Sequence, residues 1–71
     1  MTIHLVPAGR GSRYSGSLVK VRIETGRSTL HPSKVFARVK EVGASKEWKG
    51  PWDDEATAIR SICQIYSIGG P

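Results

Sequence analysis

Residues 34–42 read Lys-Val-Phe-Ala-Arg-Val-Lys-Glu-Val, and this alternation of polar and apolar side chains determines the architecture. In an extended chain, successive side chains point to opposite faces of a sheet. The apolar face consists of Val35, Ala37 and Val39, and the opposite face of Phe36, Arg38 and Lys40. The pattern predicts a strand of an antiparallel sheet with one buried face.

The segment before it, residues 18–25, alternates in the same way. Val19, Val21 and Ile23 share its apolar face, and Lys20, Arg22 and Glu24 share the other. Turn-forming residues at 25–28 and 31–33 separate the two segments, so we predict that they pair. Residues 46–52 form a third predicted strand, with Trp48 and Trp52 on one face and Gly50-Pro51 bending or ending it. Residues 3–6, stopped by Pro7, form a predicted edge strand.

Residues 53–68 have the period of a helix. Asp53 is the predicted N-cap, Asp54 and Glu55 suit the positive first turn, and residues 69–71, Gly-Gly-Pro, end the helix. The predicted apolar stripe consists of Ala56, Ile59, Ile62, Cys63 and Tyr66, with Ala58 and Ile65 on its flank. We expect one α+β domain, residues 1–71, in which three or four antiparallel strands pack on this C-terminal helix.

Size and composition narrow the class of protein. A chain of 71 residues is near the lower limit for a domain that folds alone. Cys63 is the one cysteine, which excludes a disulfide within the chain. His4 and His31 are the only other soft metal ligands, and this small number argues against a structural zinc site. With neither a membrane-spanning run nor a signal-peptide pattern, we expect a protein of the host cell's cytoplasm.

Positive charge is concentrated before the helix. Residues 1–50 hold ten basic and three acidic side chains, a net +7, and residues 51–71 hold one basic and three acidic side chains, a net −2. A polarised field of this kind attracts polyanions. Nucleic acid, DNA rather than RNA, or an acidic protein surface is therefore the expected partner.

The face of the sheet opposite the helix is the main candidate for this contact. The candidate binding residues are Lys20, Arg22, Phe36, Arg38, Lys40 and Lys49, together with Arg10 and Arg13 in a mobile Gly/Ser/Arg loop at residues 8–17. Basic side chains neutralise phosphates and an aromatic ring can stack on a base. We expect Glu24 to be the one acid on that face, and a solvated face that only keeps the protein soluble is the open alternative.

The remaining reactive residue types have structural explanations. Residues 53–55, Asp-Asp-Glu, are explained by helix capping, and Cys63 by its place in the apolar stripe. His4 and His31 are distant in sequence and lack a partner motif. We therefore expect a non-catalytic protein without cofactor or metal.

Residues 34–65 resemble a known pattern: a basic and aromatic strand, a hairpin, and Gly-Pro-Trp-Asp before a helix that opens with acids and Glu-Ala. Phage integrase arm-binding domains and plant ethylene-response DNA-binding domains are similar to this. The resemblance implies a three-stranded sheet in the DNA major groove, supported from behind by the helix. It would direct Arg22, Phe36, Arg38, Lys40, Trp48 and Lys49 toward DNA.

In its small size, its predicted small sheet with one helix, and its strong net charge, the chain is also similar to small phage proteins that include anti-CRISPR inhibitors. That likeness implies an inhibitor that docks on a host protein complex which handles nucleic acid. An enzyme accessory subunit without activity of its own is a third reading. The sequence leaves these alternatives open.

Overall fold

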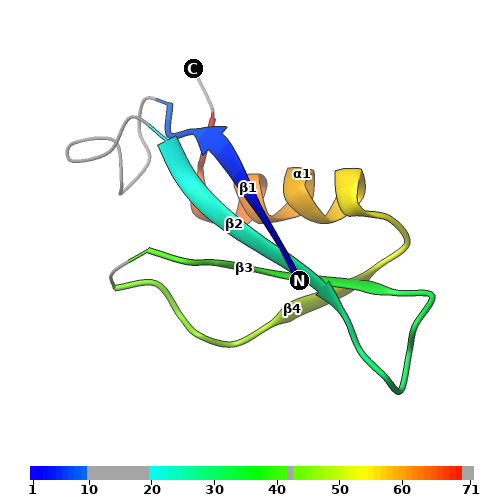
Figure 1. Cartoon of the computed structure of the whole chain (residues 1–71). Coiled ribbons are helices and arrows are strands. Elements are labelled where there is room, and N and C mark those ends of the chain that lie inside the picture. Colours follow the sequence, from blue (N-terminus) through cyan, green and yellow to red (C-terminus); the bar gives the residue numbers. More distant parts are fainter. Residues whose placement is uncertain (10–19, 42, 70–71) are drawn as a thin grey trace.

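The computed structural model describes residues 1–9, 20–41 and 43–69. It contains four strands and one helix (Figure 1): β1 Thr2–Pro7, β2 Lys20–Arg27, β3 Val35–Val39, β4 Lys49–Trp52 and α1 Glu55–Tyr66. The strands form one antiparallel sheet in the order β1-β2-β3-β4. This confirms the predicted α+β class with a C-terminal helix.

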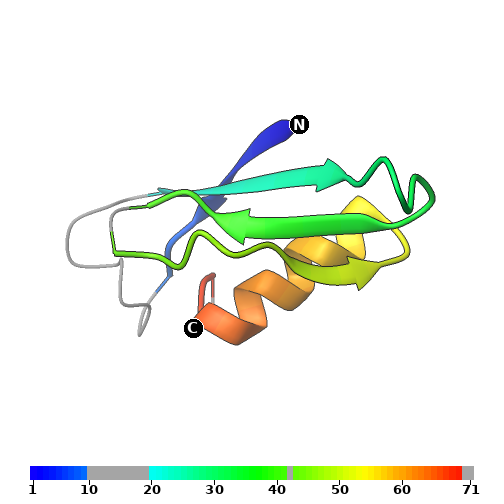
Figure 2. The same cartoon turned by 90° about the horizontal axis from the view of Figure 1, so that it is seen from below.

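The helix lies against one face of the sheet (Figure 2), where it packs on β2, β3 and β4. The buried apolar residues are Val21 and Ile23 of β2, Val35, Ala37 and Val39 of β3, Ala58 and Ile62 of α1, and Ala8 and Ile68. The predicted alternation of β2 and β3 is confirmed for these residues, while Val19 lies outside the described part. We call the helix-covered side the inner face and the opposite side the outer face.

Strand β2 continues past residue 25, where the predicted strand ended, to Arg27. We expected residues 25–28 to break the chain, but Gly26 pairs with Phe36 and Arg27 with Val35. The turn comes later, where His31 N donates to Ser28 O at 3.3 Å and Lys34 N donates to His31 O at 3.1 Å. Gly26 is therefore a strand residue, a placement that its turn propensity did not indicate.

Strand β4 contains an extra residue, and this corrects the prediction for the tryptophans. Ala37 pairs with Lys49, whereas Val35 pairs with Trp52, so two residues of β4 stand opposite Phe36. Such a bulge shifts the alternation of side chains by one. Trp52 consequently packs against the core, while Trp48 lies on the outer face against Arg38. The expected placement of both on one face is wrong.

The helix starts and ends differently from the prediction. Asp54, and not Asp53, is the N-cap, because its Oδ1 accepts from Thr57 N at 2.7 Å, while the Asp53 carboxylate pairs with Lys34 Nζ. Ser67 adopts a left-handed conformation with φ 55° and ends the helix two residues before the glycines. Ile68 N then donates to Cys63 O at 2.8 Å.

The apolar stripe is also rotated from the prediction. Ala58 and Ile62 are fully buried, and Ile59, Cys63 and Tyr66 pack against the core. Ala56 and Ile65 are exposed. The stripe is therefore centred on Ala58 and Ile62, whereas the sequence pattern predicts Ala58 on its flank.

The edge strand predicted at residues 3–6 is confirmed as β1. The segment that follows β1 contacts the C-terminal end, where Gly69 N donates to Ala8 O at 2.8 Å. Ala8, the first residue of the loop predicted at 8–17, is buried. In the described part of the chain, α1 is too short and too polar to cross a membrane.

Candidate nucleic-acid interface

The antiparallel register arranges the outer face in rows that cross the strands. Side chains directly opposite each other in such pairs lie on the same face. The pairs on the outer face are Leu5 with Arg22, Ile3 with Glu24, Glu24 with Arg38, and Gly26 with Phe36. Within the described residues, no helix or strand covers this face (Figure 2).

Arg38 occupies the centre of the outer face and has three partners. Its Nε donates to Glu24 Oε1 at 2.7 Å, and its Nη1 donates to the Lys46 carbonyl oxygen at 3.0 Å. Its guanidinium carbon lies 4.4 Å from the centroid of the Trp48 ring. The side chain of Arg38 is only 23% exposed. Arg38 therefore connects β2, β3 and the segment before β4, and it presents little charge to a ligand.

Arg22 is bound to a second carboxylate, that of Glu41, which the strand pattern does not predict on this face. Glu41 Oε2 accepts from the Arg22 backbone N–H at 2.8 Å, and Arg22 Nη2 lies 3.3 Å from Glu41 Oε1. Burial alone would raise the pKa of the Glu41 carboxyl. The hydrogen bonds from Arg22 and its positive charge lower that pKa by more than burial raises it, so the pKa lies below its ordinary value. The expectation that Glu24 is the only acid on this face is wrong.

Three lysines supply the accessible charge of the outer face. Lys20 and Lys46 are exposed and form no ion pair with a described carboxylate, and Lys40 Nζ is 4.0 Å from Glu24 Oε1. The charged groups of the face are Lys20, Arg22, Arg38, Lys40 and Lys46 against Glu24 and Glu41. These five cations and two carboxylates sum to +3, a count that does not include the exposed Glu47 between Lys46 and Trp48 in the chain. Four of these cations, all but Lys20, line a depression of about 600 Å³, which we call the basic hollow.

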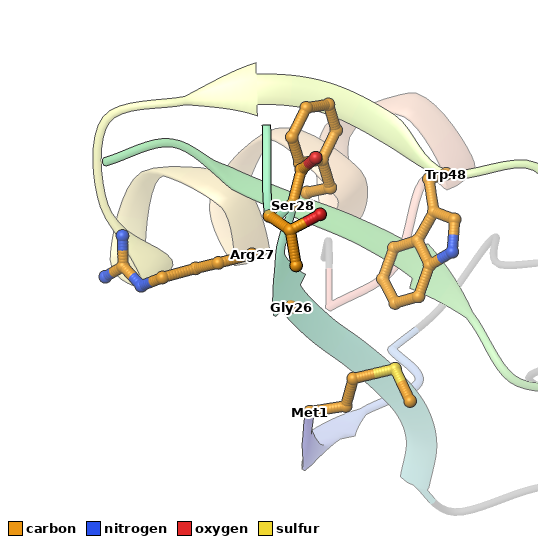
Figure 3. A pocket seen from close by; sticks show the side chains of 7 residues that line it. Met1, Gly26, Arg27, Ser28 and Trp48 are labelled. Atoms are coloured by element: carbon orange, nitrogen blue, oxygen red, sulfur yellow. The ribbon is translucent and has the colours of Figure 1, made fainter. Parts of the chain in front are cut away.

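A second depression of about 460 Å³ lies at the end of β2 and is lined by aromatic and apolar groups (Figure 3). We call it the aromatic hollow. Its lining residues are Met1, Gly26, Arg27, Ser28, Thr29, Phe36 and Trp48. In Figure 3, Trp48 and Met1 flank Gly26 from two sides, and the Arg27 side chain extends away from them. Phe36 and Trp48, which lie in different segments of the sequence, thus line the same depression.

The structure brings together most of the residues predicted for binding, but not all. Lys20, Arg22, Phe36, Arg38 and Lys40 share the outer face. Lys49 pairs with Ala37, a residue of the inner face, and so does not join them. Arg10 and Arg13 lie outside the described residues. Lys46 was absent from the predicted set, because its contribution depends on the fold of the segment between β3 and β4.

Other reactive side chains have structural partners. The Thr57 backbone N–H and hydroxyl hold the pKa of the Asp54 carboxyl below its ordinary value. His4 Nε2 lies 3.1 Å from Thr25 Oγ1 and 3.1 Å from Glu55 Oε2. Burial raises the pKa of the Cys63 thiol, which disfavours the nucleophilic thiolate. Within the residues that the structure describes, no cluster of three or more metal-ligating side chains occurs.

No protein-family model, curated protein or solved structure matches this chain.

Proposed function

We propose that this chain is a non-catalytic protein that binds nucleic acid through the outer face of its sheet. One observation supports this above all. The sheet face that the helix leaves uncovered combines five basic side chains, against the paired carboxylates of Glu24 and Glu41, with two aromatic side chains, Phe36 and Trp48. Phosphates and bases are the chemical groups that such a combination attracts.

The lysines and the arginines have different roles in this proposal. Lys20, Lys40 and Lys46 would contact phosphates, because their ammonium groups are accessible and at most weakly paired. Arg22 retains an exposed side chain and would add a contact at the cost of its bond to Glu41. Arg38 would hold Trp48 in place. We propose DNA as the more suitable ligand and the host cytoplasm as the location.

A salt titration tests the proposal. If three lysines each neutralise one phosphate, the logarithm of the affinity should fall against the logarithm of the salt concentration with a slope of about −2.7 on duplex DNA. On single-stranded DNA the slope should be about −2.1. Fluorescence anisotropy of a labelled oligonucleotide measures both. Absence of binding at low salt, or binding that salt does not weaken, would contradict the proposal.

Charge-matched variants separate a local site from the overall charge. Lys40→Gln with Lys46→Gln removes two charges from the outer face. Lys49→Gln with Arg60→Gln removes two charges elsewhere, because Lys49 pairs with Ala37 of the inner face and Arg60 is an exposed residue of α1. We expect the first pair to reduce the salt slope by about 2 and the second to leave it nearly unchanged. Equal losses from both pairs would point to non-local attraction.

An acidic surface of another protein is the second candidate for the binding partner. The exposed apolar side chains on the outer face of β1 favour it. Ile3 and Leu5 are 47% and 62% exposed and lie beside the basic row, a mixture found at protein interfaces. An inhibitor of the anti-CRISPR type would use such a surface. A defined one-to-one complex with an acidic host protein, without affinity for free nucleic acid, would favour this candidate.

A further inference from the structure

We propose that the aromatic hollow binds one unpaired base, so that the preferred ligand is single-stranded. This inference rests on the proposed function and names its ligand class. It depends on the glycine at the floor of the hollow, on the way Trp48 is held, and on the charge beside it.

Gly26 lets the Met1 and Trp48 side chains approach the strand closely and is not required by the backbone conformation. The other described glycines, Gly9, Gly43, Gly50 and Gly69, all have positive φ angles, whereas Gly26 lies in an ordinary strand conformation. A Cβ atom at Gly26 would lie 3.1 Å from Met1 Cγ and 3.6 Å from Trp48 Cη2. Glycine is unfavourable inside a strand, where it marks a bulge, a bend, or the close approach of a ligand or another chain segment. The pairing at Gly26 is regular, and the groups that approach it are the exposed Met1 side chain and Trp48, which both line the hollow.

Trp48 is fixed in position before any ligand arrives. The Arg38 guanidinium stacks on its ring, and Arg38 is itself held by Glu24, a largely buried carboxylate. The Trp48 side chain extends to the space above Gly26 (Figure 3). Phe36, which pairs with Gly26 from the neighbouring strand, also lines the hollow. Rigid aromatic groups stack on a base at little entropic cost, since they are already ordered.

The charge around the hollow selects an anionic ligand. None of the described residues that line it is acidic, so it offers no partner for a cationic side chain. The basic hollow begins four residues away along β2, at Arg22, a distance of about 13 Å. One short oligonucleotide can therefore place a base in the aromatic hollow and phosphates at Lys40 and Lys46. A base in a duplex is paired and stacked, and cannot enter.

Binding of a labelled single strand of about 12 nucleotides, compared with its duplex, tests the inference. Gly26→Val fills the floor of the hollow and should weaken single-strand binding by roughly 5- to 150-fold, the effect of losing one stacked base. Its duplex binding should equal that of the wild type. Gly26→Ala should give a smaller loss. Lys40→Gln with Lys46→Gln is the contrasting variant and should weaken both forms.

The fold of each variant is checked by circular dichroism and thermal unfolding. If Gly26→Val does not fold, Gly26→Ala carries the test, because its one methyl meets only the flexible Met1 side chain closely. A direct readout comes from Trp52→Phe, in which Trp48 is the one remaining tryptophan. A single strand should quench its fluorescence, and a duplex should not.

The outcomes distinguish the two proposals. Unchanged single-strand affinity in the folded Gly26 variants, or tighter binding of the wild type to duplex, overturns the base site and leaves the proposed function standing. Absence of binding to either form overturns both. Binding to polyglutamate in place of DNA also overturns both and favours an acidic protein partner.

Discussion

The guanidinium of Arg38 is shared by three groups, which makes this residue a structural one on a face that otherwise attracts anions. It bonds Glu24 at 2.7 Å and the Lys46 carbonyl at 3.0 Å, and it lies 4.4 Å from the Trp48 ring centroid. A lysine ammonium cannot form the forked hydrogen bonds and the stacking contact together. The sequence could not reveal this, because a basic residue on an exposed face has the same pattern whether it is paired or free.

Arg38→Lys should therefore destabilise the protein without changing its charge. We expect the free energy of unfolding to fall by about 1–2 kcal/mol, from the lost stacking contact and one lost hydrogen bond. Urea denaturation measures it. Lys40→Arg, on the same strand side, is the control and should change stability by less than about 0.5 kcal/mol. Equal effects of the two substitutions would show that Arg38 contributes only its charge.

The Glu41–Arg22 pair predicts a response to acid. Because the pKa of the folded Glu41 carboxyl lies below its unfolded value, its stabilisation is complete above the unfolded pKa and disappears as pH falls through the folded one. Unfolding followed by circular dichroism should show wild-type stability decreasing below about pH 4.5. Glu41→Gln should be less stable at neutral pH and lose less on acidification. Parallel acid profiles would contradict this role.

At the level of elements, alternation was sufficient to assign the two central strands. Val21, Ile23, Val35, Ala37 and Val39 are buried as expected, because one period-2 pattern fixes both faces at once. Alternation failed in β4, where the bulge at Gly50-Pro51 separates the faces of Trp48 and Trp52. A Cβ at Gly50 would lie 3.0 Å from the Val35 carbonyl oxygen. That constraint comes from the neighbouring strand and is invisible in a single sequence.

The candidate site was predictable in its charge and not in its geometry. The lysines and arginines of β2 and β3 follow from the strand pattern. The aromatic hollow joins Gly26, which has the propensity of a turn, with Trp48, which lies before β4. The contribution of Glu41 depends on a bond that spans 19 residues of sequence. Contacts of this kind are set by tertiary packing, so local patterns do not contain them.

The rotation of the helix stripe gives a test with two alanines. Ala58 is fully buried against the sheet, whereas Ala56 is exposed. Ala58→Leu should destabilise the protein by about 1–3 kcal/mol, because the packed interface has no room for the longer side chain. Ala56→Leu introduces the same residue at the same end of the helix and should change stability by less than about 0.5 kcal/mol. Chemical denaturation measures both. A larger effect at Ala56 would support the stripe predicted from the sequence.

Across the whole molecule, the core lies under α1 and β1 lies at the margin. The helix packs on β2, β3 and β4, and the fully buried side chains of the sheet lie in β2 and β3. β1 pairs with β2 alone and carries the exposed Ile3 and Leu5 on its outer face. Contacts near its end, between Ala8 and Gly69, connect it to the end of the helix.

This arrangement predicts a graded pattern of amide hydrogen exchange. Amides of β1 should exchange through a local opening that releases this strand from β2, at a free energy well below that of global unfolding. Amides that join β2 and β3 should exchange only by global unfolding, because their opening exposes Ile23 and Ala37, which are fully buried. Exchange measured by NMR in dilute solution tests this. Equal protection of β1 and β2 would contradict this prediction and would mean that the edge of β1 is covered in solution. Repeating the measurement at several protein concentrations would then show whether a second copy of the chain covers that edge.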